Sequence, residues 1–236
     1  MLTVPQKTFL VSGVTSGIGK AFSELAQAQG HKVIPIVRDK FTLINYKSYE
    51  RIVELDFSDT SSIEDAFSGF DSNVDGFVNC AAVLPGKSLF EQRLDGLVKL
   101  FNVNIITPML IIKRIQKNLK PGSSIILLGS ISAQKGSYDD PYAATKGAIH
   151  SLVKSLSLKF ASNNIRVIGI APGITDNTRM TNNLIEGLYE RNIEKVPLKH
   201  AAQTEDIANL ILFLSNSYAK SITGAVIDVN GGQYLR

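Results

Sequence analysis

Residues 8–19 read TFLVSGVTSGIG, and this stretch decides the fold. The apolar run 8–12 is rich in β-branched and aromatic residues, which is typical of a buried strand. Glycines at 13, 17 and 19 follow it, and apolar residues then recur at helical spacing up to residue 29. A strand, a tight turn and an uncapped helix start present backbone N–H groups to a pyrophosphate. The alternative is an ordinary glycine-rich turn, because the spacing G-x-x-x-G-x-G is not specific by itself.

The rest of the chain repeats this alternation of strands and helices. Short apolar runs predict strands at 8–12, 32–37, 51–55, 76–79, 124–128, 165–171 and 225–229. Helical spacing predicts helices at 17–29, 61–70, 142–160 and 204–214, and two helices or one helix kinked at Pro108 over 89–119. Pro121 and Gly122 predict a turn before the fifth strand. This order predicts an α/β fold, a single doubly wound Rossmann-type domain over residues 1–236 with a seven-stranded parallel sheet.

The composition excludes several classes of protein. The 236 residues are 44% apolar with a net charge of +4, which is too apolar for disorder and too weakly basic to favour nucleic acid. Cys80 is the only cysteine, and the three histidines lie far apart, so we expect no internal disulfide and no metal site. No apolar run approaches the roughly 20 residues that span a bilayer, and the N-terminus does not read as a signal peptide. We therefore expect a cytoplasmic protein with no membrane and no nucleic-acid partner.

The ends of the next strands carry further signals for a nucleotide cofactor. Arg38 follows the second strand, where a carboxylate would bind a ribose hydroxyl and an arginine would bind a 2′-phosphate, so it favours NADP(H). Asp39 follows at once and weakens this inference, and the alternative is a solvated turn. Asp56 closes the third strand and either hydrogen-bonds the adenine or is an ordinary strand-end aspartate. Asn79 and the small residues after it close the fourth strand, and we interpret Cys80 as a packing residue rather than a nucleophile.

Three residues form a candidate catalytic group. Ser130 ends the fifth strand, and Tyr142 and Lys146 share a helix face because they are four residues apart. A phenol titrates near 10, and we expect the ammonium of Lys146 together with a positively charged nicotinamide to lower the pKa of Tyr142. By itself a Tyr-x-x-x-Lys pattern is more often a helix surface, so its position after the serine matters. Ser132 and Tyr138 are the rival candidates, and we rank both lower.

In these motifs the chain resembles the short-chain dehydrogenase/reductase family. The resemblance runs from residue 8 to residue 232 and includes the glycine loop, Asn104 and the Ser130, Tyr142 and Lys146 pattern. It implies that Tyr142 donates or accepts the proton, that Lys146 lowers its pKa and binds the nicotinamide ribose, that Ser130 orients the carbonyl, and that Asn104 holds a water. The residues expected to bind NADP(H) are Gly13, Thr15, Ser16, Gly17, Ile18, Gly19, Arg38, Asp56, Phe57, Asn79, Ala81, Tyr142, Lys146, Pro172, Gly173 and Thr175.

The chain departs from the family pattern at three places. Ser12 stands where the family usually has threonine, and a hydroxyl is kept. The usual Asn-Asn-Ala-Gly is Asn-Cys-Ala-Ala at residues 79–82. The segment after Gly173 is one residue longer, so either Thr175 or Thr178 meets the carboxamide.

The substrate is less well defined by the sequence. Within the family the chain is most similar to bacterial 3-oxoacyl-carrier-protein reductases, which implies an acyl thioester substrate. Pro121 and Asn163 occupy places where those enzymes tend to carry arginines that grip the carrier protein, so a free ketone, a sugar or a secondary alcohol is an alternative. A non-catalytic NADP(H)-binding regulatory protein is a second alternative. We expect residues 173–200 to form a substrate lid, and the resemblance implies a homotetramer or dimer.

Overall fold

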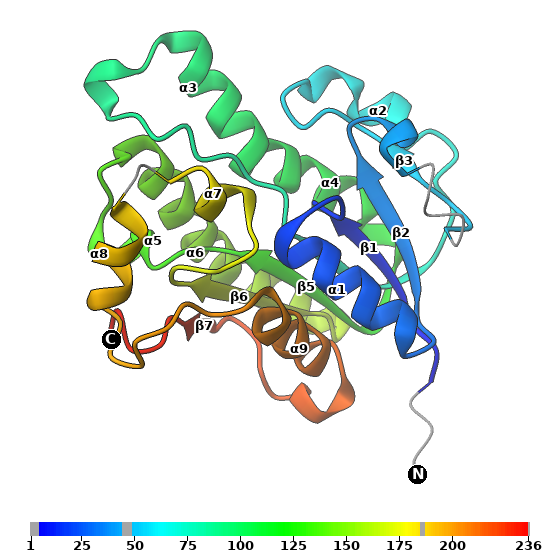
Figure 1. The fold of residues 1–236 in the computed structure, drawn as a ribbon. Coiled ribbons are helices and arrows are strands. Elements are labelled where there is room, and N and C mark those ends of the chain that lie inside the picture. Colours follow the sequence, from blue (N-terminus) through cyan, green and yellow to red (C-terminus); the bar gives the residue numbers. More distant parts are fainter. Residues whose placement is uncertain (1–4, 44–48, 185–186, 236) are drawn as a thin grey trace.

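The computed structural model describes residues 5–43, 49–184 and 187–235. Within them, seven parallel strands form one sheet in the order β3-β2-β1-β4-β5-β6-β7 (Figure 1). The strands are β1 Thr8–Ser12, β2 Lys32–Val37, β3 Val53–Glu54, β4 Val74–Asn79, β5 Leu119–Leu128, β6 Arg166–Pro172 and β7 Val226–Val229. The strand order reverses between β1 and β4, where a doubly wound sheet binds its ligands. The predicted fold class is confirmed.

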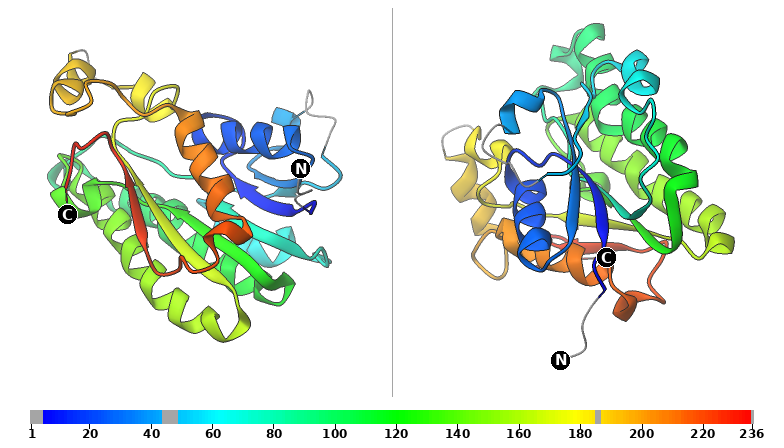
Figure 2. Two further views of the ribbon diagram at one scale, coloured as in Figure 1. Left: turned by 90° about the horizontal axis from the view of Figure 1, so that it is seen from below. Right: turned by 90° about the vertical axis from the view of Figure 1, so that its right-hand side faces the viewer.

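Helices cover both faces of the sheet. They are α1 Gly17–Ala28, α2 Ile63–Ala66, α3 Leu94–Phe101, α4 Thr107–Ile115, α5 Ser132–Lys135, α6 Asp140–Phe160, α7 Arg179–Asn182, α8 Leu188–Glu194 and α9 Thr204–Leu214. The two views of Figure 2, one from below and one from the side, show α1 and α9 on one face of the sheet and α4 and α6 on the other. Each face has its own apolar cluster, and strands between two such layers are buried on both sides, which explains their continuous apolar runs.

The packing of β1 illustrates how the sequence specifies this core. Phe9 is fully buried and meets Phe22 of α1 edge-on, with ring centroids 5.3 Å apart. Burial of one phenylalanine side chain stabilises a fold by about 2 kcal/mol. The contact therefore fixes α1 against the first strand, and with it the loop that joins them.

Most predicted elements are confirmed, with two local corrections in the strands. β3 is limited to Val53–Glu54, although a strand was predicted over 51–55. Pro121 and Gly122 lie within β5, although a turn before this strand was predicted there. The strand continues because the N–H of Gly122 donates to the carbonyl of Asn164. Its pairing with β4 shifts register between Val74 and Gly76 of β4.

The helices also differ from the prediction in places. The region predicted as a helix over 61–70 contains only the short α2 after a 3₁₀ turn. α5, α7 and α8 were not predicted, since each is too short to show a helical period. The predicted kink at Pro108 is replaced by a π-helical turn, Asn102–Ile106, that joins α3 to α4. Pro108 then falls at the second residue of α4, where a missing N–H costs little.

The helix that runs over residues 94–118 is, among the described residues, long and apolar enough to cross a membrane by length and composition alone. In this fold 44% of its apolar window is buried, and Ile111, Ile112 and Ile115 pack into the core beneath the sheet. The helix thus packs one side into the core and leaves other apolar side chains, such as Leu94 and Met109, exposed.

Candidate active site

The candidate site lies at the carboxyl ends of β1, β4, β5 and β6. Ser12 ends β1, and its hydroxyl donates to Oδ1 of Asn79 at the end of β4 over 2.8 Å. The same hydroxyl accepts the N–H of Ala81 at 3.1 Å. The hydroxyl of Ser12 therefore ties the two strand ends together.

The glycine loop after β1 is tightly packed and leaves the start of α1 open. Gly13 has a φ of +74°, and a Cβ there would lie 2.9 Å from the backbone nitrogen of Ala81. A Cβ at Gly19 would lie 2.5 Å from the carbonyl oxygen of Gly13, so only glycine lets the helix approach the strand. Ser16 is the N-cap of α1, but its side chain makes no capping hydrogen bond. The first N–H groups of α1 therefore lack a side-chain cap and suit the phosphates of a dinucleotide.

The end of β2 offers an exposed cation. No carboxylate within residues 5–43, 49–184 and 187–235 forms an ion pair with Arg38. The neighbouring Asp39 is occupied, since its Oδ1 accepts the N–H of Phe41 at 2.8 Å. The carboxylate that weakened the argument for NADP(H) is thus engaged in the local turn.

Asp56 and Phe57 follow β3, and a helix holds this segment in place. Oδ1 of Asp56 accepts both the N–H and the hydroxyl of Ser58 at 2.8 Å. The side chain of Phe57 is buried in the core, so this residue can face a cofactor only through its backbone. Its carbonyl accepts the hydroxyl of Thr107 at 2.9 Å, which attaches the segment to the start of α4.

The structure brings the three predicted catalytic residues together. Tyr142 and Lys146 lie on α6, and they are 7% and 3% exposed. Ser130 is also buried, and its side chain is hydrogen-bonded to that of Tyr142. Nζ of Lys146 donates to the carbonyl of Leu128 at 2.7 Å and lies 5.6 Å from the centre of the Tyr142 ring.

The pKa values of this pair differ from the expectation. Burial raises the pKa of Tyr142 to about 12, and the hydrogen bond with Ser130 offsets this only in part. Burial lowers the pKa of Lys146 to about 8. The expected lowering of the Tyr142 pKa by the ammonium is therefore not met in the protein alone, because desolvation dominates and Nζ is directed at a backbone carbonyl.

The residues that the sequence ranked lower, Ser132, Tyr138 and Cys80, lie near this pair or precede its helix. The backbone N–H of Ser132 donates to the hydroxyl of Ser130 at 3.1 Å, so this rival supports the predicted serine. Tyr138 is 51% exposed and precedes α6. Cys80 is packed against the core and burial raises the pKa of its thiol to about 12, which agrees with a packing residue. In the described part of the chain, no group of three or more His, Cys, Asp or Glu side chains could hold a metal ion.

Asn104 lies in the π-helical turn, and its side-chain amide is fully used. Its Oδ1 accepts the N–H of Val83 at 2.9 Å, and its Nδ2 donates to the carbonyl of Val83 and to the hydroxyl of Thr145, both at 3.0 Å. The amide joins the loop after β4 to α6, one residue before Lys146. In a regular helix the carbonyl of Asn104 would accept an N–H from residue 108, which is a proline.

The segment after β6 lies between Ser130 and the glycine loop. Pro172 ends β6, and its carbonyl accepts the N–H of Ile131 at 3.2 Å, beside Ser130. The hydroxyl of Thr175 donates to the carbonyl of Gly173 at 3.2 Å. Thr178 caps α7, and its methyl lies 3.5 Å from where a Cβ on Gly17 would be. Thr178 therefore reaches the glycine loop, whereas Thr175 is turned toward its own strand end.

Sequence reasoning missed two residues that shape the site. Gly129 precedes Ser130, and a Cβ there would lie 2.4 Å from Nε2 of His150, so any other residue would displace this side chain of α6. A glycine next to a strand-end serine was a visible signal for this close contact. Asp139 is fully buried and accepts the N–H of Tyr142. An aspartate three residues before Tyr142 was a visible N-cap signal.

Comparisons with known proteins agree with this geometry. A family model described as enoyl-(acyl carrier protein) reductase matches residues 13–233. The 3-oxoacyl-(acyl-carrier-protein) reductase FabG of Buchnera aphidicola from Schizaphis graminum is 28% identical over 99% of this chain and 100% of its own length. Carbonyl reductase family member 4 of Xenopus tropicalis is 32% identical over 98% of this chain and 99% of its own length. A short-chain dehydrogenase/reductase of Brucella melitensis superposes with a TM-score of 0.89 at 31% identity, over 98% of this chain and 97% of that one.

A doubly wound sheet with a glycine loop at β1 and a buried Tyr-Lys pair beside the end of β5 defines an oxidoreductase. The chain belongs to the short-chain dehydrogenase/reductase family.

Proposed function

We propose that this protein is an NADP(H)-dependent oxidoreductase that interconverts a carbonyl and a secondary alcohol. The observation that carries the proposal is the buried group of Ser130, Tyr142 and Lys146 on the strand ends next to the glycine loop. When bound, the nicotinamide cofactor supplies or accepts the hydride at the carbonyl carbon. Tyr142 gives its proton to the developing alkoxide, and Ser130 orients the substrate oxygen. Proton transfer by a positioned group contributes about 10² to 10⁴ in rate.

Lys146 and Asn104 support the proton transfer. The ammonium of Lys146 lies close enough to the Tyr142 ring to stabilise a phenolate once a cofactor adds its own positive charge. Asn104 would hold a water through its backbone carbonyl, since its side-chain amide is committed to Val83 and Thr145. That water would connect Lys146 to solvent.

The cofactor is NADP(H) rather than NAD(H) in this proposal. Arg38 is exposed at the end of β2, where its guanidinium would meet a 2′-phosphate, and the adjacent Asp39 accepts the N–H of Phe41 in the local turn. Residues 13–19 would bind the pyrophosphate, and Asp56 would bind the adenine through its second oxygen. Pro172, Gly173 and Thr175 or Thr178 would bind the nicotinamide end.

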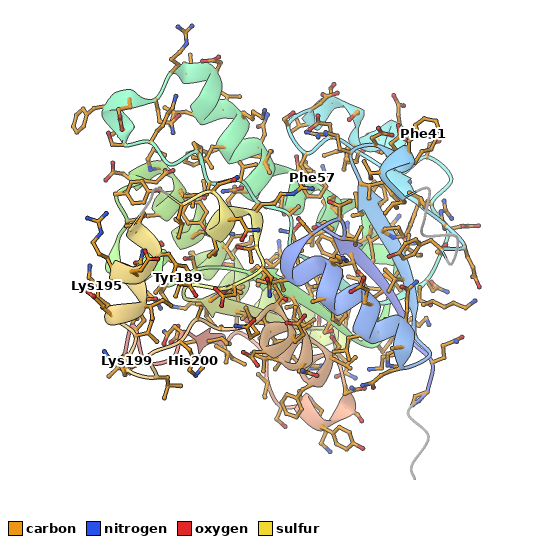
Figure 3. All side chains as sticks on the ribbon, in the orientation of Figure 1. Phe41, Phe57, Tyr189, Lys195, Lys199 and His200 are labelled. Atoms are coloured by element: carbon orange, nitrogen blue, oxygen red, sulfur yellow. The ribbon has the colours of Figure 1, made fainter. Side chains whose placement is uncertain are left out.

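The substrate that we favour is a 3-oxoacyl thioester. The FabG relative supports it, and so does a cationic edge formed by Lys135 of α5 with Lys195 and Lys199 after α8. Figure 3 shows Lys195 and Lys199 at this edge of the molecule. Burial lowers the pKa of Lys135, and the nearby positive charge of Lys195 lowers it further. An acidic carrier or a phosphate would be attracted there. The second candidate is a free ketone, sugar or alcohol, supported by the carbonyl reductase relative and by the uncharged Pro121 and Asn163.

The remaining features of the proposal concern the surroundings of the site. Residues 173–200, of which 185 and 186 lie outside the described residues, would form a lid that includes α7 and α8. The chain would act in the cytoplasm as a homotetramer or dimer. Exposed apolar side chains on α3 and α4, Leu94 and Met109 among them, support assembly of identical copies.

The test is consumption of reduced nicotinamide with an acetoacetyl thioester, run in parallel with NADPH and NADH. We expect turnover with NADPH and at least a 100-fold loss in Tyr142→Phe, since the phenol proton is removed. Tyr138→Phe is the matched control, because that phenol is exposed and four residues away. Turnover by Tyr142→Phe at the wild-type rate would disprove the mechanism. Tight NADPH binding without turnover on thioesters, free ketones or sugars would favour a non-catalytic NADP(H)-binding protein.

A further inference from the structure

Asp139 is a buried carboxylate that the proposed proton transfer does not use. It lies directly before α6 and is fully buried. No lysine, arginine or histidine within residues 5–43, 49–184 and 187–235 forms an ion pair with it. A buried carboxylate without a cation is costly unless hydrogen bonds satisfy it, so its partners indicate its function.

Those partners are three backbone N–H groups from two separate segments. Oδ1 accepts the N–H of Tyr142 at 3.0 Å and so caps α6. Oδ2 accepts the N–H of Gly86 at 2.8 Å and that of Lys87 at 3.3 Å. One side chain therefore joins the start of the catalytic helix to the loop that follows β4.

The same loop is attached to the neighbourhood of α6 at two further points. The amide of Asn104 holds Val83 and also contacts Thr145 of α6. Oδ2 of Asp140 accepts the N–H of Leu89 at 3.1 Å, but this carboxylate is exposed. Asp139 is the attachment that contacts Tyr142 directly.

Resting on the function proposed above, we propose that Asp139 is a positioning residue of the reductase site, whose buried carboxylate clamps the loop of residues 84–89 to the start of α6 and thereby fixes Tyr142. A loop beside the site is expected to shape the substrate pocket, so its release should weaken substrate binding. A carboxylate that served only as a helix cap would not need the two N–H groups of the loop.

The charge of Asp139 also acts on the phenol. Burial raises the pKa of Tyr142, the hydrogen bond with Ser130 lowers it, and the negative charge of Asp139 raises it further. Lys146 lies beside the ring on the same helix, and Tyr138 faces Asp139 from the preceding loop, where the carboxylate adds to the effect of burial in raising its pKa. Removal of the Asp139 charge should therefore make Tyr142 easier to deprotonate.

The first test is amide hydrogen exchange on the cofactor-free protein, with Asp139→Asn, Asp139→Ser and the control Asp140→Asn. Serine keeps an N-cap but cannot reach the loop, and asparagine presents an N–H₂ group to the loop donors. We expect the amides of Gly86 and Lys87 to exchange at least tenfold faster in both Asp139 variants. In Asp140→Asn only Leu89 should change. Wild-type exchange at Gly86 and Lys87 in either folded Asp139 variant would overturn the clamp.

The second test is the pH dependence of NADPH-driven reduction of an acetoacetyl thioester. For Asp139→Asn and Asp139→Ser we expect KM to rise severalfold and the alkaline limb of kcat to move to lower pH, because Tyr142 must be protonated to act as the acid. The same KM and limb as Asp140→Asn would show that Asp139 only caps the helix. If the wild type turns over no carbonyl compound, the proposed function fails, and the exchange experiment still decides whether the clamp exists.

Discussion

At the scale of one residue, the burial of Lys146 in the candidate site lowers the stability of the folded protein. Lys146 is only 3% exposed, and its ammonium donates a hydrogen bond to the carbonyl of Leu128 at 2.7 Å. Burial lowers its pKa from 10.5 to about 8, which means that the folded protein disfavours the charged form. The penalty is fully present below pH 8 and disappears as pH rises from 8 to 10.5, where the unfolded chain binds more protons than the native one.

We expect Lys146→Met to be more stable than the wild type at pH 7 and inactive. The shift from 10.5 to about 8 corresponds to about 3 kcal/mol, and loss of the hydrogen bond to Leu128 offsets about 1–2 kcal/mol of it. Thermal or urea unfolding at pH 7 and pH 10 measures the gain, which should shrink at the higher pH. Lys154→Met is the control, an exposed lysine on the same helix. A stability gain that is equal at both pH values would contradict the buried-charge explanation.

A hydrogen-bonded group joins three elements near the predicted lid. Tyr189 of α8 donates its hydroxyl to Oδ1 of Asp176 at 2.9 Å, and Gln203, the N-cap of α9, donates to Oδ2 at 3.0 Å. Asp176 follows β6, so the group ties α8 to the strand that ends at the site. The hydrogen bond to Asp176 raises the pKa of Tyr189, so the phenol stays a donor across the neutral range.

We expect Tyr189→Phe to raise KM severalfold and to leave kcat within about twofold. A hydrogen bond to a charged group is worth about 1.5–3 kcal/mol, less where water competes, and α8 would lose that attachment. Steady-state kinetics with the acetoacetyl thioester measure the change. Tyr218→Phe is the control, since that tyrosine is 68% exposed after α9. A fall in kcat at unchanged KM would argue that the group acts on the chemical step and not on the lid.

At the scale of the whole molecule, the sheet could be predicted because its strands are buried on both faces. Ile125, Ile126 and Leu127 form a continuous apolar run, and all three are fully buried in β5. Short elements without a repeating pattern could not be predicted in this way. The 3₁₀ turn and four-residue α2 in place of a long helix, and the π-helical turn before Pro108, depend on tertiary contacts such as that from Thr107 to Phe57.

The grouping of the three candidate catalytic residues was predictable for a different reason, since their spacing on one helix and one strand end requires no knowledge of packing. The pKa of Tyr142 was not predictable, because it depends on how deeply α6 is buried and on where Nζ of Lys146 points. Neither was the choice of Asp139 partners, which come from residues 52 and 53 positions earlier in the chain. Charges and distances between remote segments emerge only from the folded structure.

The outer surface of the helix over 94–118 carries an apolar stripe that the fold leaves uncovered. The exposed side chains are Leu94, Val98, Phe101, Ile106 and Met109. The first three are four and three residues apart, so they share one face. α6 lies beside α3 on the same side of the sheet, and its Leu158 is 82% exposed. An apolar face of this kind is typical of an interface, and the proposed homo-oligomer would cover it.

We expect Val98→Glu to shift the protein toward a smaller species. A carboxylate at the centre of the stripe would be buried without a partner in the oligomer but solvated in the monomer, so it destabilises only the assembly. Light scattering after size-exclusion chromatography measures the mass, and circular dichroism confirms that the variant is folded. Phe41→Glu is the control, because Phe41 is 67% exposed near the end of β2, away from the stripe (Figure 3). An oligomer that keeps its mass in Val98→Glu would place the interface elsewhere, and a monomeric wild type would remove the proposal of a homo-oligomer.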